Sequence, residues 1–410
     1  MTTTRTATAT RRMLPSLLLL LTVFGPISMD LYLPALPALT TELSAATSVA
    51  QLTVTACLVG LALGQLVAGP LSDRYGRRGI LLIGITAYIV TSLLCAASPS
   101  IELLVLTRLV QGVTGGVGIV IAQAAGRDVY SGTALIRFYG RLTVTGGFAA
   151  IVGPLFGGLL NTVADWRGLF VFLAALGAGI LIVTLLVFTE TLPDGARTSG
   201  GLGRTLNDFR TLFADRVFLG AILNQGFLYA ALFAYLSGAT FVLQEIYGLS
   251  PLGYALAFGA NSAGYMVLGH LAGRSPERLL RRTLNAGVGV AALGAIGLLG
   301  AGIARMPLWV VLVSLFLLAG GVAISSPPAT TIALVEYPRI AGTASSLLGM
   351  VRFGFGGVAA PLVGIAGATS ILPLGVVTVV AVALAAASFL LLARTARTRR
   401  TPAASLTAVR

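Results

Sequence analysis

Asp30 is an acidic residue inside a stretch of sequence that is long and apolar enough to cross a membrane. A charge near the middle of a bilayer costs at least about 2.5–3.5 kcal/mol, so such a residue normally faces a cavity or a partner. Removal from water favours the neutral form of a carboxyl group, whereas a nearby cation favours its charged form. This residue could therefore gain and lose a proton as its surroundings change. An inert ion pair or a capped helix break before Pro34 is the structural alternative.

Two arginines, Arg108 and Arg352, also lie within predicted spans. Asp30 lies seven residues before Pro37, and Arg108 lies seven residues after Ile101. At a rise of 1.5 Å per residue, both are about 10 Å from the outer ends of their spans. Arg108 is thus the natural partner of Asp30, although equal depth does not decide whether the two side chains face each other. Arg352 is roughly 16 Å into its span, and no acidic residue in the second half matches it.

The composition identifies a polytopic membrane protein. The chain is 56% hydrophobic and 10% charged, whereas soluble domains are about 25% charged. The net charge of +14 comes from arginines between apolar segments, which favours a role in topology over nucleic-acid binding. Cys57 and Cys95 lie within apolar segments and have no metal-ligand spacing, so we expect neither a metal site nor a cofactor.

A membrane-spanning helix needs roughly 20 apolar residues, and this length divides the chain into twelve spans. We therefore predict an all-α membrane protein of twelve transmembrane helices. The predicted spans are 14–36, 50–71, 79–97, 101–123, 139–161, 168–189, 217–244, 252–272, 284–304, 308–333, 341–366 and 371–393.

The positions of the arginines support this division. Cytoplasmic segments of membrane proteins carry an excess of positive charge. With both termini placed in the cytoplasm, 23 of the 27 arginines fall in cytoplasmic segments. One missed or extra span would destroy this alternation.

Two six-helix bundles are predicted, at residues 14–189 and 217–393. Residues 190–216 are rich in glycine and mixed charge, as in a flexible cytoplasmic linker. Residues 1–13 and 394–410 are predicted to be cytoplasmic tails. We find no phosphate-binding loop motif, so ATP is not expected to drive this protein.

A charged loop after the second span recurs in the second half of the chain. The stretch Gly69–Arg78 contains glycines and charges that must end a membrane helix. The same spacing returns 204 residues later, around Gly273, Arg278 and Arg282. Because that offset is half the chain, we interpret the two halves as copies of one unit that run in parallel.

The fifth predicted span is rich in glycine and contains one proline. Small residues let helices approach closely, and proline removes a backbone hydrogen bond and bends a helix. The pattern is consistent with ordinary tight packing, but it favours a pivot between bundles. The residues concerned are Gly140, Gly153, Pro154, Gly157 and Gly158.

Three of these motifs resemble those of the major facilitator superfamily. Gly69, Asp73, Arg74, Gly76, Arg77 and Arg78 resemble its loop 2–3 signature. The resemblance implies that Asp73 sits against the start of the eleventh helix and that the arginines join a charge network which locks the outward-facing state. Leu104, Arg108, Gln111 and Gly112 resemble the fourth-helix motif, which implies a role for Arg108 in proton coupling. The fifth-span glycines resemble the antiporter motif of exporters, with Ala149 in place of one glycine.

Further stretches are similar to the Bcr/CflA drug-resistance transporters, which export bicyclomycin, chloramphenicol and related compounds. They are Met29–Pro37, Arg127–Tyr130, Phe233–Gly238 and Gln244–Pro251. This resemblance implies that Asp30 and Arg108 take part in coupling and substrate binding. Arg352 departs from the neutral residue expected at its position, so it favours an anionic or strongly hydrogen-bonding substrate.

We therefore predict a proton-driven efflux antiporter, not an enzyme, in the bacterial inner membrane. It is expected to be a monomer in the lipid bilayer that takes a small-molecule drug and protons as its partners. The drug cavity should lie between the bundles, and its candidate lining residues are Tyr32, Gln111, Phe227, Tyr235 and Arg352. The alternatives are a proton-coupled exporter or importer of a metabolite and, less favoured, a membrane-embedded enzyme or receptor.

Overall fold

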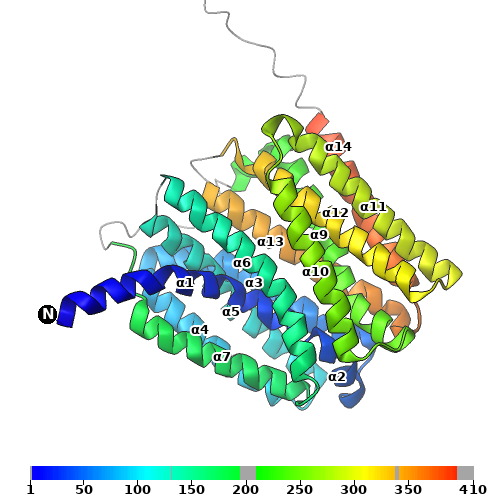
Figure 1. Cartoon of the computed structure of the whole chain (residues 1–410), viewed down its shortest axis with the longest axis horizontal. Helices are drawn as coiled ribbons and strands as arrows, with labels where there is room; N and C mark the ends of the chain where they lie inside the picture. The colour runs from blue at the N-terminus through cyan, green and yellow to red at the C-terminus, as the bar shows by residue number, and fades with distance from the viewer. Residues whose placement is uncertain (1, 131, 194–208, 338–340, 395–410) are drawn as a thin grey trace, which may run out of the picture.

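The computed structural model describes residues 2–130, 132–193, 209–337 and 341–394. At some positions of α6 and α13 it describes the backbone alone. Helices of the first half of the chain form one bundle, and helices of the second half form another beside it (Figure 1). The first bundle contains α1 (Thr2–Asp30), α2 (Leu36–Glu42), α3 (Thr47–Tyr75), α4 (Arg77–Ala96), α5 (Ile101–Val129), α6 (Gly132–Leu160) and α7 (Trp166–Val187).

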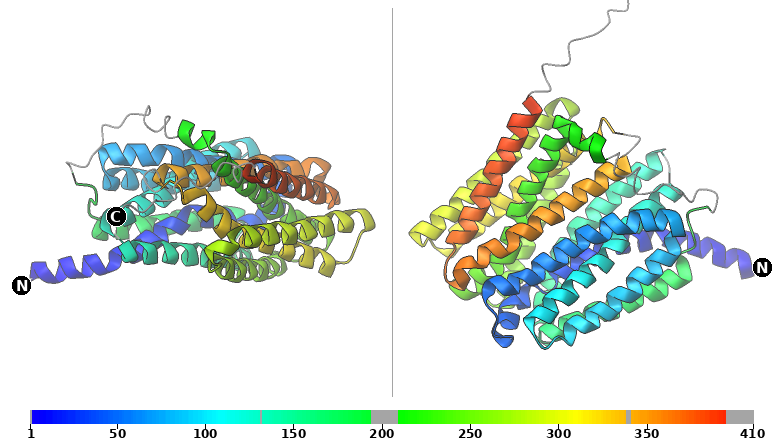
Figure 2. Two further views of the ribbon diagram at one scale, coloured as in Figure 1. Left: turned by 90° about the horizontal axis from the view of Figure 1, so that it is seen from above. Right: turned by 180° about the vertical axis from the view of Figure 1, so that it is seen from behind.

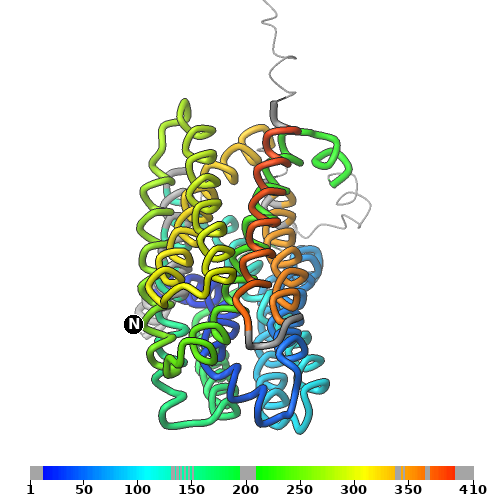
Figure 3. The backbone as a smooth tube through the Cα atoms, turned by 90° about the vertical axis from the view of Figure 1, so that its right-hand side faces the viewer, coloured from blue at the N-terminus to red at the C-terminus, as the bar shows by residue number. Residues whose placement is uncertain are grey.

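The second bundle repeats this arrangement. Its members are α9 (Arg216–Phe241), α10 (Pro251–Gly273), α11 (Leu280–Ala304), α12 (Leu308–Leu334), α13 (Ala341–Ala359) and α14 (Leu372–Arg394). The long helices run roughly along one direction (Figure 3). The first turns of α1 project beyond the other helices (Figure 2). The polar residues predicted to form an N-terminal tail thus continue the first helix.

Each of the twelve predicted spans corresponds to a helix. Within the described residues, ten helices are long and apolar enough to cross a membrane. The other two long helices, α6 and α10, have 29 and 23 residues and pack against each other. The prediction of an all-α membrane fold is confirmed.

The first predicted span is not one continuous helix. Residues 14–36 were expected to form it, but α1 ends at Asp30. A turn and a short 3₁₀ helix, η1 (Leu33–Ala35), then lead into α2. Pro34 and Pro37 occupy the first turns of η1 and α2. The helical conformation is disfavoured for a residue that directly precedes a proline.

Glycines bring α3 and α5 into backbone contact. A side chain added at Gly60 would overlap the carbonyl oxygen of Leu109, and one added at Gly64 would overlap that of Val113. Gly112 of α5 lies equally close to the Cys57 carbonyl. The missing side chains let the two helices pack closely and hold the segment that carries Arg108 against the rest of the bundle.

The two ends of the molecule are defined by the chain path. We call the end at which α7 stops and α9 starts the linker end. At this end α3 stops at Tyr75, Gly76 adopts a φ of 94°, and α4 starts at Arg77. Glycine tolerates this positive φ without strain. The charged loop therefore ends a helix, as predicted, and so does its copy after Gly273.

The opposite end, which we call the closed end, is joined across the two bundles. Among the described residues, three hydrogen bonds connect the bundles, and all three lie there. Thr240 donates to the Leu33 carbonyl at 2.8 Å, Gln244 donates to the Pro34 carbonyl at 3.1 Å, and Gln51 donates to the Ser237 carbonyl at 3.5 Å.

Candidate functional site

Asp30 is the last residue of α1 and lies directly before the turn that reaches the closed end. Its side chain is buried, with 9% of its surface exposed. A Cβ atom added at Gly153 of α6 would lie 2.9 Å from the Asp30 Cβ. Three residues further along the chain, the Leu33 carbonyl accepts a hydrogen bond from Thr240 of the second bundle. Asp30 thus lies against α6, within three residues of a contact between the two bundles.

Arg108 is fully buried inside the first bundle. Its Nη1 atom donates to the Ser28 carbonyl at 3.2 Å and to Gln111 Oε1 at 2.6 Å. The guanidinium lies over the Tyr32 ring, 4.3 Å from its centre, and 5.5 Å from the centre of the Phe170 ring. Such stacking stabilises a cation by interaction with the negative face of the ring.

Arg108 does not pair with Asp30. None of the ion pairs between described residues includes either side chain. Arg108 instead binds the backbone of α1 two residues before Asp30, at Ser28. Its Nε and Nη2 atoms are buried without a hydrogen-bond partner. Arg108 therefore meets α1 within one turn of Asp30, but its bond goes to the Ser28 carbonyl and not to the Asp30 carboxyl group.

The predicted cavity residues occupy several environments. Tyr32 is fully buried, and its hydroxyl group lies 2.9 Å from Thr53 Oγ1. Gln111 is also fully buried and donates to Ser92 within the first bundle. Neither residue is exposed to a cavity between the bundles in this conformation.

Tyr235 and Phe227 belong to α9 of the second bundle. The Tyr235 hydroxyl group accepts a hydrogen bond from Asn261 of α10 at 3.1 Å, and Ser237, two residues further on, accepts one from Gln51 of the first bundle through its carbonyl. Phe227 lines an apolar pocket of about 480 Å³ formed by residues of α9, α13 and α14. Phe227 therefore lines a pocket within the second bundle, whereas Tyr235 lies near the interface.

Arg352 of α13 is the centre of a polar cluster in the second bundle. Its Nε atom donates to Gln225 and its Nη2 atom donates to Thr330, both at 2.9 Å. The guanidinium lies 5.0 Å from the centre of the Tyr229 ring, and the Tyr229 hydroxyl group is 3.1 Å from that of Tyr265. None of the ion pairs between described residues includes Arg352, and its printed hydrogen-bond partners are neutral.

The sequence and the fold both match a known transporter family. The model of the Major Facilitator Superfamily matches residues 18–361. The chain belongs to the Major Facilitator Superfamily. It is therefore a multi-pass membrane transporter of a small-molecule substrate and not an enzyme.

Two bacterial proteins illustrate the similarity of this superfamily transporter to its relatives. It is 37% identical to the uncharacterized MFS-type transporter YdgK of Bacillus subtilis (strain 168), over 92% of this chain and 95% of that protein. It is 30% identical to a chloramphenicol resistance protein of Pseudomonas aeruginosa, over 85% and 82% of the two chains.

The fold of the transporter is similar to that of solved members. A bacterial homolog of the human lysosomal transporter Spinster, in an inward-facing and unoccupied conformation, superimposes with a TM-score of 0.77. The two chains are 18% identical, and the match covers 96% of this chain and 99% of the other. At this identity the likeness concerns the fold alone.

The charged loop of the transporter forms an ion-pair network inside the first bundle. Arg77 pairs with Asp73 at 2.5 Å and with Asp128 at 3.2 Å, and it donates to Ser72 at 2.7 Å. The resemblance implied that Asp73 sits against the eleventh helix. In this conformation its carboxylate instead pairs with Arg77 and is half exposed, while the side chains at the very start of α13 lie outside the described residues.

Gly69, Arg74 and Arg78 occupy the edges of this network. A Cβ atom at Gly69 would make ordinary contact with Val120 of α5. Arg74 lies over the ring of Tyr75, and Arg78 donates to the Leu185 carbonyl of α7 at 3.3 Å. The loop is thus fastened to α5 and α7 of its own bundle.

Glu190 caps this loop and was not recognised in the sequence. Its carboxylate accepts from the backbone N–H groups of Arg77 at 2.9 Å and Arg78 at 3.1 Å, at the N-terminus of α4. Partial desolvation opposes ionisation, but these bonds and those from Thr191 and Leu192 hold the pKa of Glu190 below its ordinary value. A carboxylate at a helix N-terminus is also favoured by the helix dipole. The one feature of the sequence that could have drawn attention to Glu190 is its position just after α7.

The fifth-span glycines place α6 against the break after α1. A side chain at Gly157 would overlap the Leu31 carbonyl oxygen, and Gly153 lies against Asp30. A Cβ atom at Gly158 would lie 2.6 Å from Ala255 of α10. Pro154 lies inside the same helix. Gly140 also belongs to α6, but its surroundings lie outside the described residues.

Sequence reasoning did not find the polar partners of the buried arginines. Ser28 contributes only its backbone carbonyl, which no side-chain pattern indicates. Gln225, Tyr229 and Thr330 lie in two different helices. The sequence indicated these partners only by the presence of polar residues within apolar spans.

Proposed function

We propose that this transporter is a proton-driven antiporter of a bacterial cytoplasmic membrane and that it exports small amphipathic antibiotics of the phenicol or bicyclomycin type. The likeness to a chloramphenicol resistance protein supports the drug class. The motifs around Asp30 and along α6 support export coupled to protons. The substrate of this chain is thus inferred, whereas its membership in the superfamily is shown.

The position of Asp30 at the closed end carries the proposal. The three residues after the turn form η1, and the Leu33 and Pro34 carbonyls accept the hydrogen bonds from Thr240 and Gln244 that join the bundles. Asp30 itself lies against Gly153 of α6. A change in the charge of this carboxyl group would therefore act within a few residues of the contacts that close this end.

Burial and exposure of Asp30 give a mechanism for coupling. In the closed conformation the carboxyl group is almost out of contact with water, and low polarity favours its neutral form. When the bundles separate at the closed end, water reaches the carboxyl group and allows proton exchange with that side. If the proton and the drug compete for this region, inward proton flow drives the drug outward.

The linker end is assigned to the cytoplasm in this proposal. The asymmetric distribution of arginine supports the assignment, because 23 of the 27 arginines lie in segments on that side or in the tails. With this orientation, the closed end faces outward. The structure then corresponds to a state in which substrate enters from the cytoplasm.

The Arg352 cluster is assigned to substrate recognition. It offers a cation, the Gln225 amide and the hydroxyl groups of Tyr229 and Tyr265 close to one another. A few placed polar groups among apolar side chains are typical of ligand sites. Phenicols carry hydroxyl, amide and nitro or sulfonyl groups that fit such a site.

Drug-driven proton movement in inverted membrane vesicles tests the proposal. Addition of chloramphenicol should release protons from vesicles that contain the wild-type chain. Asp30→Asn should abolish this movement without loss of the folded protein. Asp165→Asn is the matched control, because Asp165 caps α7 outside the spans by accepting from Gly168 N–H and asparagine is an equally good N-cap.

Two results would reject the proposal. Undiminished proton movement in the Asp30→Asn vesicles would remove this carboxyl group from the coupling step. A wild-type chain that moves protons with none of the antibiotics, and does not lower drug accumulation in cells, would instead favour the transport of a metabolite.

A further inference from the structure

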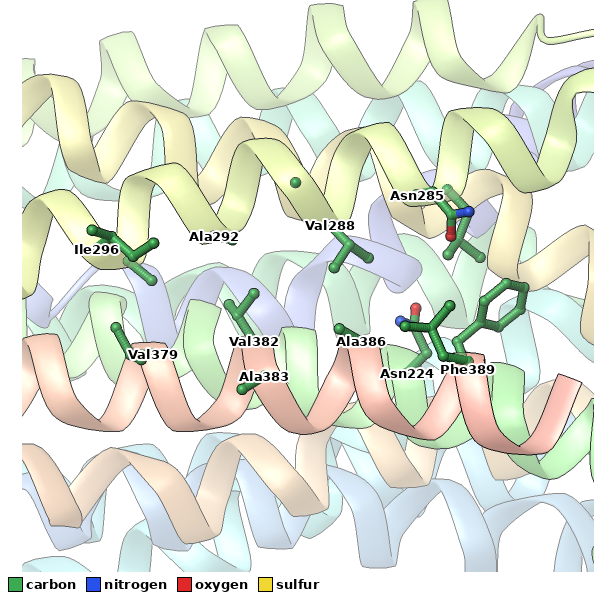
Figure 4. Close-up of a pocket in the computed structure, with 14 residues that line it drawn as sticks. Asn224, Asn285, Val288, Ala292, Ile296, Val379, Val382, Ala383, Ala386 and Phe389 are labelled. Carbon is green, nitrogen blue, oxygen red and sulfur yellow. The ribbon is translucent and has the colours of Figure 1, made fainter. Parts of the chain in front are cut away.

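A groove of about 420 Å³ runs between α11 and α14 on the second bundle. Val288, Ala292 and Ile296 of α11 face Val379 and Val382 of α14 across it (Figure 4). Apart from two asparagines, its lining is apolar. The volume lies in the range of about 300–1,000 Å³ that is common for ligand sites.

This groove opens toward the lipid and not toward the other bundle. Leu293 of α11 is 63% exposed and Ile296 is 60% exposed. On α14, Leu390 and Ala383, which line the groove, are also exposed. Apolar side chains on the outer face of a membrane protein face acyl chains, so the groove is accessible from the bilayer.

The end of the groove nearest the linker end is polar. Asn224, Asn285 and Phe389 lie together there (Figure 4). Asn224 is fully buried, and its Nδ2 atom donates to the Ala385 carbonyl at 2.8 Å. That bond fixes the orientation of the amide, and the Oδ1 atom has no hydrogen-bond partner. An unpaired buried acceptor is unfavourable, and a ligand hydroxyl group that donates to it would remove that cost.

Arginines surround the same end. The Arg281 guanidinium lies 5.9 Å from the centre of the Phe389 ring, which is part of the groove lining. Arg278 and Arg282 are within one turn of it, and Glu277 is the nearby acidic residue in the sequence. None of the ion pairs between described residues includes these arginines. The polar end of the groove therefore carries a net positive charge.

We propose that this groove is a binding site for an anionic phospholipid with a hydroxylated headgroup, such as phosphatidylglycerol. One acyl chain lies between α11 and α14, and the phosphate contacts Arg281. A headgroup hydroxyl donates to Asn224 Oδ1. Basic pockets between helices at the cytoplasmic face are suited to anionic headgroups. The site is separate from Asp30 and from the Arg352 cluster, and it requires no assumption about the transported drug.

Two glycines of α11 provide a matched pair of variants. A Cβ atom at Gly289 or at Gly300 would meet no atom within 4 Å, so neither substitution should disturb the fold. Gly289 lines the groove, whereas Gly300 does not. Gly289→Leu therefore fills the groove, and Gly300→Leu adds the same side chain elsewhere on the same helix.

Native mass spectrometry of the purified full chain measures the binding. Wild type and Gly300→Leu should retain phosphatidylglycerol in preference to phosphatidylcholine, and Gly289→Leu should bind it at least tenfold more weakly. Arg281→Gln, a change at an exposed position, should reduce the preference for phosphatidylglycerol and leave phosphatidylcholine binding unchanged.

The proposal is overturned if Gly289→Leu and Gly300→Leu bind phosphatidylglycerol equally. It is also overturned if wild type binds both lipids equally, since the arginines would then have no role. A Gly289→Leu protein that fails to fold still leaves the Arg281→Gln comparison, in which an unchanged lipid preference contradicts the site.

Discussion

Arg108 is a buried cation whose nearest partners are neutral. It contacts a backbone carbonyl, an amide and two aromatic rings, and two of its nitrogen atoms have no hydrogen-bond partner. A buried charge without a counter-ion lowers stability. Residues that cost stability in this way are typical of functional sites.

We therefore expect Arg108→Met to separate stability from transport. Methionine has a similar length and no charge, so the thermal midpoint of the purified protein should stay unchanged or rise. Drug-driven proton movement in inverted vesicles should fall at least tenfold. A marked drop in the thermal midpoint would instead show that Arg108 has a mainly structural role.

Arg352 differs from Arg108 because its side chain is partly exposed and sits among hydroxyl and amide groups. Arg352→Gln removes its charge and keeps some hydrogen-bonding capacity. We expect the half-saturating concentration of anionic or strongly hydrogen-bonding drugs to rise about tenfold, and that of neutral apolar drugs to stay the same. Competition assays over a drug panel measure this, with Arg274→Gln at the end of α10 as the control. An equal change for all drugs would contradict a role in recognition.

At the scale of elements, the packing of α6 on the break after α1 connects the motif glycines to Asp30. Gly157 lies against the Leu31 carbonyl, Gly153 against Asp30 and Gly158 against α10. A displacement of α6 therefore moves both the carboxyl group and the second bundle. The break itself exists because two prolines follow Asp30 within seven residues.

Gly157→Ala should push α6 away from this break, because the added methyl group would overlap a backbone carbonyl that cannot rotate aside. We expect proton movement to fall at least tenfold and the free energy of unfolding to drop by about 1–3 kcal/mol. Gly179→Ala on α7, where a methyl group meets no atom within 4 Å, is the control and should be neutral. Normal transport by Gly157→Ala would show that the close contact is dispensable.

The cap of α4 by Glu190 gives a pH-dependent contribution to stability. Because the pKa of Glu190 is lowered in the folded chain, its contribution is present above the pKa of the unfolded chain and is lost as the pH falls through the folded value. We expect Glu190→Gln to lower stability by less than about 1 kcal/mol near neutral pH, since the group is largely exposed. Thermal unfolding from pH 3 to pH 7 measures this. The difference from wild type should shrink at the acidic end, and a constant difference would contradict the assignment.

For the whole molecule, we expect the hydrogen bonds at the closed end to stabilise the conformation in which this end is shut. Thr240 and Gln244 belong to the second bundle, and their acceptors belong to the break of α1 in the first. The charged loop at the linker end is held by partners in its own bundle. Among the residues whose side chains are described, the hydrogen bonds between the bundles lie at the closed end.

Thr240→Val removes one of these bonds with little change in volume, and it also removes the bond that Gln244 donates to the Thr240 hydroxyl group at 3.0 Å. A lost hydrogen bond of about 1 kcal/mol should increase the population open at this end about fivefold. Distances between spin labels on Thr41 and Glu245, in a chain without native cysteines, measure that population. Thr331→Val is the control, because the Thr331 hydroxyl group bonds only within α12, to the Pro327 carbonyl. Unchanged distances in Thr240→Val would show that this bond does not hold the closed state.

The sequence by itself determined the all-helical membrane fold and the order of the long helices, although it extended the first helix beyond Asp30. Apolar length, the spacing of arginines and helix-breaking residues are local properties, and they indicated the fold and the family. They also showed that a buried acidic residue at position 30 required an explanation. One explanation was a capped helix break before Pro34.

Only the tertiary structure decided which groups meet. Residue spacing along a helix gives depth, but the direction of a side chain depends on how each helix is rotated against its neighbours. That rotation turned Arg108 toward Ser28 and Tyr32 instead of Asp30. It also brought Glu190 to α4 and gathered the partners of Arg352 from separate helices, because contacts between distant segments form only when the whole bundle packs.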